Sequence, residues 1–293
     1  MPSLFVDVGG ISLRNPIMLA AGILGTTGAS LRRAAQAGAG GVVTKSIGIE
    51  PREGHPGPNM VQVECGRINA MGLPNPGYKD FQEEIDLARK EGVLVVASIF
   101  GSSAAEFARI ARGLEADAFE LNLSCPHAEG YGAAIGTDPM LVETCTQAVS
   151  KSGVPTWVKL TPNVTDITVI GKAAERGGAS AIVAINTLKA MRISTGLRRP
   201  VLGNRFGGLS GSAVFPVAVR CVYELYDAVK IPIIGCGGIA SADNVVEMMM
   251  AGARAVEIGS AVQADATVFE KIKKELYAKD GLDADGIVGC AHA

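Results

Sequence analysis

Ile231-Pro232-Ile233-Ile234-Gly235-Cys236-Gly237-Gly238-Ile239 is the stretch that decides the fold of this chain. Its first half is an apolar run of strand length, and its second half is a glycine-rich turn that leads into a segment with helical spacing. A continuous rather than alternating apolar run is typical of a strand buried on both faces, as in a parallel sheet covered by helices. The stretch therefore predicts one strand–turn–helix unit of an α/β fold.

The same unit recurs along the whole chain. Apolar runs of strand length lie at residues 17–21, 41–44, 93–99, 118–123, 156–160, 181–185, 231–235 and 255–258. Segments with helical spacing follow them at 30–37, 80–90, 104–114, 139–151, 167–176, 216–229, 244–250 and 268–277, and several stop at a glycine suited to the helix terminus, at Gly38, Gly92, Gly177 and Gly252. Eight units without a linker-like break predict one domain over residues 1–293, an α/β TIM (β/α)₈ barrel with long active-site loops. A hairpin at 5–14 is expected to close the bottom of the barrel.

Composition excludes several classes of protein. The net charge is −2 and no basic tract occurs, so a nucleic-acid partner is not expected. The first residues lack the pattern of a signal peptide and no apolar run reaches 18 residues, so we expect a cytoplasmic protein with no membrane association. Six scattered cysteines without a CxxC pair predict reduced thiols and no metal site.

Three connections that follow strands are long, at residues 46–78, 124–138 and 186–215. In a TIM barrel the loops after the strands build the active-site face, and long ordered loops are usually functional. Many of the predicted strands also end in polar or glycine-rich clusters, which would all meet at this face. One such cluster is ordinary turn chemistry, but their convergence predicts a binding site.

The glycine-rich turns after the last two strands suit a phosphate. Gly237-Gly238 and Gly259-Ser260 each lead into a helix, where backbone N–H groups and the helix dipole favour an anion. The alternative is that these glycines only close tight turns. Phosphate binding is favoured because this pair of loops is the common phosphate site of TIM barrels.

Two lysines lie in or beside apolar strands. A buried lysine is costly unless it is paired with an anion, so Lys45 and Lys159 indicate either a structural ion pair with an internal carboxylate or an anionic ligand. Two lysines at one mouth favour the ligand. Nearby asparagines offer both donors and acceptors, which suits a planar ring with NH and C=O groups.

Cys125 stands at the start of a glycine-containing loop after a strand. A single cysteine is more often an inert buried residue. A free cysteine titrates at about 8.5, so a modest shift would make a thiol in this place a general base near neutral pH.

Six segments together carry a family resemblance: Asn69-Ala70-Met71-Gly72-Leu73-Pro74-Asn75-Pro76-Gly77, Asn122-Leu123-Ser124-Cys125-Pro126, Val158-Lys159-Leu160-Thr161-Pro162-Asn163, Ile185-Asn186-Thr187, Gly207-Gly208-Leu209-Ser210-Gly211 and Gly235-Cys236-Gly237-Gly238-Ile239. In order and spacing they resemble the class 1 dihydroorotate dehydrogenases over essentially the whole chain. The Gly-Gly-Leu-Ser-Gly segment resembles the class 1B branch.

The resemblance implies non-covalent FMN on the barrel and oxidation of (S)-dihydroorotate to orotate in pyrimidine biosynthesis. Cys125 would remove the C5 proton while hydride passes from C6 to flavin N5, and Lys159 would lie beside the flavin N1/O2 edge. The substrate would be held by Lys45, Asn69, Met71, Gly72, Leu73, Asn122, Asn186 and Thr187. The cofactor would be lined by Ala21, Gly22, Thr44, Lys45, Ser46, Asn122, Lys159, Ile185, Gly211, Cys236, Gly237, Gly238, Gly259 and Ser260.

The resemblance also implies partners. It implies a homodimer core and, for class 1B, a heterotetramer with a separate electron-transfer subunit that carries FAD and a 2Fe–2S cluster and passes electrons to NAD⁺. This chain has no cysteine set for such a cluster.

One departure from the family pattern keeps a second reading open. His127 stands two residues after Cys125, where the family commonly has Asn, and a similar Ser-Cys-Pro-His sequence occurs in dihydropyrimidine dehydrogenases, which act on uracil and thymine. Lys45 favours dihydroorotate, because orotate has a carboxylate that uracil lacks. A flavin-dependent tRNA dihydrouridine synthase would need a basic surface and an RNA-binding domain, and a non-catalytic phosphate-binding barrel would not need Cys125.

Overall fold

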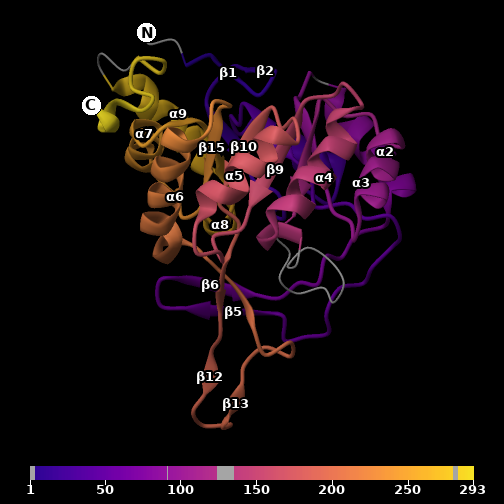
Figure 1. The fold of residues 1–293 in the computed structure, drawn as a ribbon. Helices are drawn as coiled ribbons and strands as arrows, with labels where there is room; N and C mark the ends of the chain where they lie inside the picture. Colours follow the sequence, from indigo (N-terminus) through magenta and orange to yellow (C-terminus); the bar gives the residue numbers. More distant parts are fainter. Residues whose placement is uncertain (1–3, 91, 124–134, 280–282) are drawn as a thin grey trace.

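Eight parallel strands close into a barrel in this computed structural model, which describes residues 4–90, 92–123, 135–279 and 283–293 (Figure 1). Around the barrel they follow the chain order, and the last strand pairs with the first. The strands are β3 (Ile17–Leu19), β4 (Gly41–Val43), β7 (Val95–Ile99), β8 (Ala118–Asn122), β9 (Thr156–Leu160), β10 (Ala181–Ala184), β15 (Ile233–Cys236) and β16 (Ala253–Ile258). The predicted TIM barrel is confirmed.

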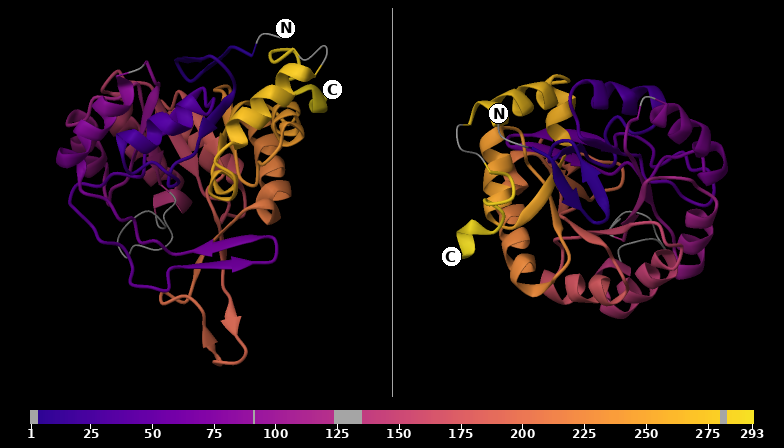
Figure 2. Two further views of the ribbon diagram at one scale, coloured as in Figure 1. Left: turned by 180° about the vertical axis from the view of Figure 1, so that it is seen from behind. Right: turned by 90° about the horizontal axis from the view of Figure 1, so that it is seen from above.

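Helices surround the barrel as an outer ring, which Figure 2 shows from above. Each follows one barrel strand: α1 (Gly28–Gln36), α2 (Tyr78–Arg89), α3 (Ala104–Arg112), α4 (Pro139–Ser150), α5 (Ile167–Arg176), α6 (Phe215–Ala228), α7 (Ala242–Met250) and α9 (Val268–Ala278). A short helix, α8 (Ser260–Ala264), precedes α9, and 3₁₀ turns occur at η1 (Ile135–Thr137), η2 (Ser212–Val214) and η3 (Cys290–His292). Within the described residues, no helix has the length and apolar character needed to cross a membrane.

Local sequence signals explain where many of the helices begin and end. Ser103 caps α3 by accepting a hydrogen bond from the Glu106 N–H, and Asp138, Asp166 and Ser241 cap α4, α5 and α7 in the same way. The left-handed glycine after α5 is Gly178, with φ +88°, rather than Gly177, whose φ is −69°. The turn is therefore one residue longer than the sequence suggested.

The N-terminal hairpin lies at the amino-terminal end of the barrel, as expected. It consists of β1 (Val6–Val8) and β2 (Ile11–Leu13). Trp157, near the start of β9, donates from its indole N–H to the Gly9 carbonyl oxygen at 3.2 Å. A Cβ at Gly9 would lie only 2.4 Å from the Trp157 ring nitrogen, so glycine is required for this close approach.

A second, antiparallel sheet lies at the opposite end, below the barrel in Figure 1. Its strand order is β11 (Leu188–Ala190), β14 (Gly207–Ser210), β6 (Gly66–Asn69) and β5 (Met60–Val63). A further hairpin, β12 (Ile193–Ser194) with β13 (Arg199–Pro200), projects from it. The sequence predicted long active-site loops at 46–78 and 186–215, and the structure shows that these two loops pair with each other.

Candidate active site

A cavity opens at the carboxyl ends of the barrel strands and is covered in part by the antiparallel sheet. It collects nearly all the residues that the sequence predicted for a site. They are Ala21, Gly22, Lys45, Ser46, Asn69, Met71, Gly72, Leu73, Asn122, Lys159, Ile185, Asn186, Thr187, Gly211, Cys236, Gly237, Gly238, Gly259 and Ser260. The strand ends and the long loops therefore form one site.

Three predicted or discussed residues are not part of this lining. Thr44 is fully buried, and its Oγ1 accepts a hydrogen bond from the Ser98 backbone N–H at 3.0 Å, so it joins β4 to β7 instead of facing the cavity. Cys125 and His127 lie outside the described residues.

A chain of hydrogen bonds fixes the polar side chains on one wall. Asn122, at the end of β8, donates from Nδ2 to Ser46 Oγ at 3.0 Å, and Ser46 Oγ lies 3.0 Å from Ser98 Oγ. Asn186 donates from Nδ2 to Asn122 Oδ1 at 3.3 Å. The chain holds two amides in defined orientations, which is what recognition of a ring with NH and C=O groups requires.

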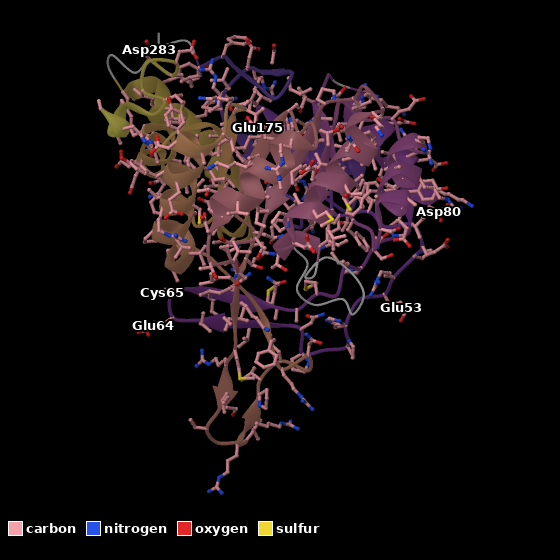
Figure 3. All side chains as sticks on the ribbon, viewed as in Figure 1. Glu53, Glu64, Cys65, Asp80, Glu175 and Asp283 are labelled. Atoms are coloured by element: carbon pink, nitrogen blue, oxygen red, sulfur yellow. The ribbon has the colours of Figure 1, made fainter. Side chains whose placement is uncertain are left out.

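The antiparallel sheet supplies the facing wall. Asn69 pairs with Gly208 between β6 and β14, and its side chain donates to the Gly208 carbonyl oxygen at 3.3 Å. Asn163 donates to the Thr187 carbonyl oxygen at 3.1 Å and so fixes the backbone beside the cavity. The turn between β5 and β6, with Glu64 and Cys65 labelled in Figure 3, is held because the Cys65 carbonyl oxygen accepts from the Ala213 N–H and the Ser212 hydroxyl.

The glycine turns after β15 and β16 form the end of the cavity suited to a phosphate. Gly237 and Gly238 have φ values of +126° and +74°, and Gly259 directly precedes α8. A Cβ at Gly238 would lie 2.6 Å from the Phe215 Cβ and 2.9 Å from the Gly211 carbonyl oxygen. Glycine is thus required at position 238, because a side chain there would clash with these two atoms.

Lys159 lies at the base of the cavity inside an ion-pair cluster. Its Nζ is 2.5 Å from Glu257 Oε2 and 3.6 Å from Glu120 Oε2. Burial alone would lower the pKa of Lys159, but interactions with Cys236, Glu120 and Glu257, including the hydrogen bond to Glu257, outweigh burial and raise that pKa well above its usual value. Burial, together with the neighbouring Glu257, raises the pKa of Glu120. Sequence reasoning favoured a ligand over an internal carboxylate for Lys159, and the structure shows both a cavity position and internal carboxylates.

Sequence reasoning missed part of the site. The cavity is also lined by Ala20, Ile23, Met60, Arg67, Leu209, Ser210, Val214 and Gln263. Arg67 on β6 donates to the Gln263 side chain of α8 and so links the antiparallel sheet to the end of the barrel. Glu120 and Glu257 were also missed, although each interrupts an apolar strand, and a charge in such a strand is a signal of an internal ion pair.

A TIM barrel with a polar, lysine-containing cavity at the carboxyl ends of its strands belongs to the class of barrel enzymes that bind small molecules. The family model described as Dihydroorotate dehydrogenase matches residues 3–279. The chain belongs to the dihydroorotate dehydrogenase family.

The similarity to curated relatives extends over almost the full chain. The chain is 56% identical over 291 residues to the "Dihydroorotate dehydrogenase B (NAD(+)), catalytic subunit" of Methanocella arvoryzae, covering 98% of this chain and 97% of that one. It is 56% identical to the protein of the same name from Methanosarcina mazei, covering 99% and 95%, and 49% identical to that from Pyrococcus furiosus, covering 99% of both. The resemblance to class 1B is confirmed, and the dihydropyrimidine dehydrogenase reading is not favoured.

Proposed function

We propose that this chain is the catalytic subunit of a dihydroorotate dehydrogenase that oxidises (S)-dihydroorotate to orotate in pyrimidine biosynthesis. The observation that carries the proposal is the position of Lys45 in the same cavity as Asn69, Asn122 and Asn186. The Lys45 ammonium beside three amides matches a ring that carries both imide groups and a carboxylate.

The residues present fit FMN as the cofactor. The glycine turns after β15 and β16 offer backbone N–H groups to a phosphate. The Gly211 carbonyl oxygen lies close to Gly238 and leaves no room for a side chain there. Lys159 offers a buried positive charge at the base of the same cavity. When bound, FMN supplies the two-electron acceptor of the oxidation.

The chain's own residues bind and orient the substrate. Lys45 holds the carboxylate, and the hydrogen-bonded pair of Asn122 and Asn186 orients the ring. Cys125 takes the C5 proton as general base. The loop that precedes α2 forms another wall of the cavity with Met71, Gly72 and Leu73.

We further propose that the chain works in an assembly. The relatives are named catalytic subunits of an NAD(+)-linked enzyme, which supports a partner subunit. The assembly we propose is a homodimer core of this chain joined to an electron-transfer subunit with FAD and a 2Fe–2S cluster. The separate subunit would deliver electrons to NAD⁺.

The test compares substrates on the purified chain loaded with FMN and given a dye as electron acceptor. We expect dihydroorotate to be oxidised and dihydrouracil to be turned over at least tenfold more slowly, because only dihydroorotate has the carboxylate that Lys45 binds. Cys125→Ala should keep FMN and lose at least about 10²-fold in rate, the contribution of a positioned base. Equal rates on both substrates, or a chain that cannot be loaded with FMN, would refute the proposed function.

A further inference from the structure

Three ionisable side chains meet below the cavity, and the proposed reaction uses only one of them. Glu120 comes from β8, Lys159 from β9 and Glu257 from β16. The side chains of both glutamates are completely buried, and that of Lys159 is 6% exposed. Only Lys159 lines the cavity, so the two carboxyl groups lie behind it in the barrel interior.

The charges of this triad do not balance if all three groups are ionised. Lys159 Nζ has one short contact, 2.5 Å to Glu257 Oε2, while Glu120 Oε2 is at 3.6 Å, beyond hydrogen-bond distance. Among the described atoms, both Glu120 oxygens and Glu257 Oε1 have no hydrogen-bond partner. A buried, unsatisfied carboxylate is very costly, and such a group usually becomes neutral instead.

A further ionisable group near the triad adds no negative charge to it. Cys236 on β15 faces the triad, and burial raises the pKa of its thiol to about 12, so the thiol is neutral near pH 7. Lys159 is therefore the cation that serves both carboxyl groups in this part of the described structure.

We propose that Glu120 holds a proton and forms, with Glu257 and Lys159, a charge-neutral triad that sets the electrostatic potential at the base of the cavity. Glu257 acts as a positioning residue, because its short hydrogen bond fixes the Lys159 ammonium. The role of the triad toward the cofactor rests on the proposed function.

The consequence concerns the redox potential of bound FMN. An isolated buried lysine would strongly stabilise the extra negative charge of a reduced flavin and raise its potential, since charges interact strongly in a buried site. The Glu257 carboxylate cancels most of that effect. A lower potential suits an enzyme whose electrons must go on to a nicotinamide, which is a weak oxidant.

The first test measures the midpoint potential of FMN in Glu120→Gln, Glu257→Gln and the double variant. Glu120→Gln imitates a protonated glutamic acid, so its potential should stay near that of the unmutated protein. Glu257→Gln should cause only a small rise, because Glu120 can release its proton and become the counter-ion of Lys159. The double variant leaves Lys159 without a counter-ion, and the ratio of reduced to oxidised flavin at a fixed ambient potential should rise at least tenfold, or about 30 mV for a two-electron couple.

The matched control is Asp117→Asn. It also removes one carboxylate, but Asp117 precedes β8 at the other end of the barrel, where it pairs with Arg89 and accepts from the Val95 N–H. The inference fails if the double variant shifts the potential no more than Asp117→Asn does. It also fails if either single variant shifts the potential as far as the double variant.

The second test needs no flavin and no activity. The infrared spectrum of the flavin-free protein should contain the carbonyl band of a protonated carboxylic acid near pH 7, and Glu120→Gln should remove that band while Asp117→Asn keeps it. A spectrum without such a band, or one unchanged by Glu120→Gln, would show that Glu120 holds no proton. Because this measurement is independent of the cofactor, it separates failure of the triad from failure of the proposed function, and it remains decisive if the double variant does not fold.

Discussion

Lys45 is the residue that we expect to decide substrate choice. It lies two residues beyond the end of β4, and its backbone N–H donates to the Gly25 carbonyl oxygen at 2.8 Å, which fixes the start of its side chain at the cavity edge. Removing one partner of a shielded charge pair costs about 2–4 kcal/mol. We therefore expect Lys45→Ala to weaken orotate binding by this amount and to leave uracil binding almost unchanged, as measured by titrating both ligands against the flavin absorbance.

Lys189→Ala provides the control for Lys45→Ala. Lys189 is an exposed lysine on β11, outside the cavity lining, and it lies over the Phe206 ring at 5.2 Å. The substitution Lys189→Ala removes the same charge as Lys45→Ala but outside the cavity, so orotate and uracil should both bind as they do to the unmutated protein. If Lys45→Ala weakened orotate and uracil alike, Lys45 would serve the flavin and not the substrate carboxylate.

Individual site residues were predictable where a motif fixes their position on the chain. Lys45, Asn122 and Asn186 line one cavity, and their meeting there was predictable because every strand of a parallel barrel ends at the same face. Thr44 was assigned to the cofactor lining by the family resemblance, but its hydroxyl bonds across to β7. The carboxyl partners of Lys159 were not predicted, because they come from strands far apart in sequence.

At the scale of single elements, the turn after β15 carries a clear prediction. Gly238→Ala would place a methyl group 2.6 Å from the Phe215 Cβ, in a residue whose φ is +74°. The left-handed backbone costs about 1–2 kcal/mol and the overpacking about 1–3 kcal/mol more. We expect Gly238→Ala to lower the free energy of unfolding by the sum, about 2–5 kcal/mol, and to release FMN during purification.

Gly153→Ala separates the two causes of that loss. Gly153 has φ +79°, and a Cβ there would meet no atom within 4 Å. It should cost only the backbone part, about 1–2 kcal/mol, with FMN retained. Denaturant unfolding and the flavin content of each purified variant measure both effects. Equal losses in the two variants would mean that packing at the Gly238 turn is not important.

The elements that sequence analysis missed are those formed by long-range pairing. The barrel strands were found because each is a continuous apolar run. By contrast, β5 and β14 are four residues long, and β5 alternates between exposed and half-buried positions. The strand β6 pairs with β14, and the paired residues Asn69 and Gly208 are 139 positions apart in the sequence. A pairing over that distance leaves no local sequence pattern from which it could be predicted.

For the whole molecule, the fold was predictable because one signal is repeated eight times. The order of strands around the barrel then follows from the preference for neighbouring, right-handed connections. The β1–β2 hairpin departs from that repeat at the amino-terminal end of the barrel. The antiparallel sheet and its projecting β12–β13 hairpin depart from it at the cavity end (Figure 2). Regular elements thus build the scaffold, and the irregular loops complete the site.

The stability of the whole molecule should depend on pH through Glu120. Burial raises the pKa of Glu120 above its ordinary value of 4.5, so the folded state keeps a proton that the unfolded chain releases. This contribution to stability is complete below about pH 4.5 and is lost as the pH rises toward the folded-state pKa. Within that window each pH unit lowers the free energy of unfolding by about 1.4 kcal/mol. Lys159 stays charged throughout this range, because its pKa is raised as well.

Glu120→Gln cannot lose the proton it imitates, so its melting temperature should exceed that of the unmutated protein by a margin that grows as the pH rises from 5 toward the folded-state pKa of Glu120. Thr146→Val, a change at a buried hydroxyl on α4 that does not titrate, should differ from the unmutated protein by the same amount at every pH. A Glu120→Gln margin that stayed constant across this range would mean that Glu120 is ionised in the folded protein.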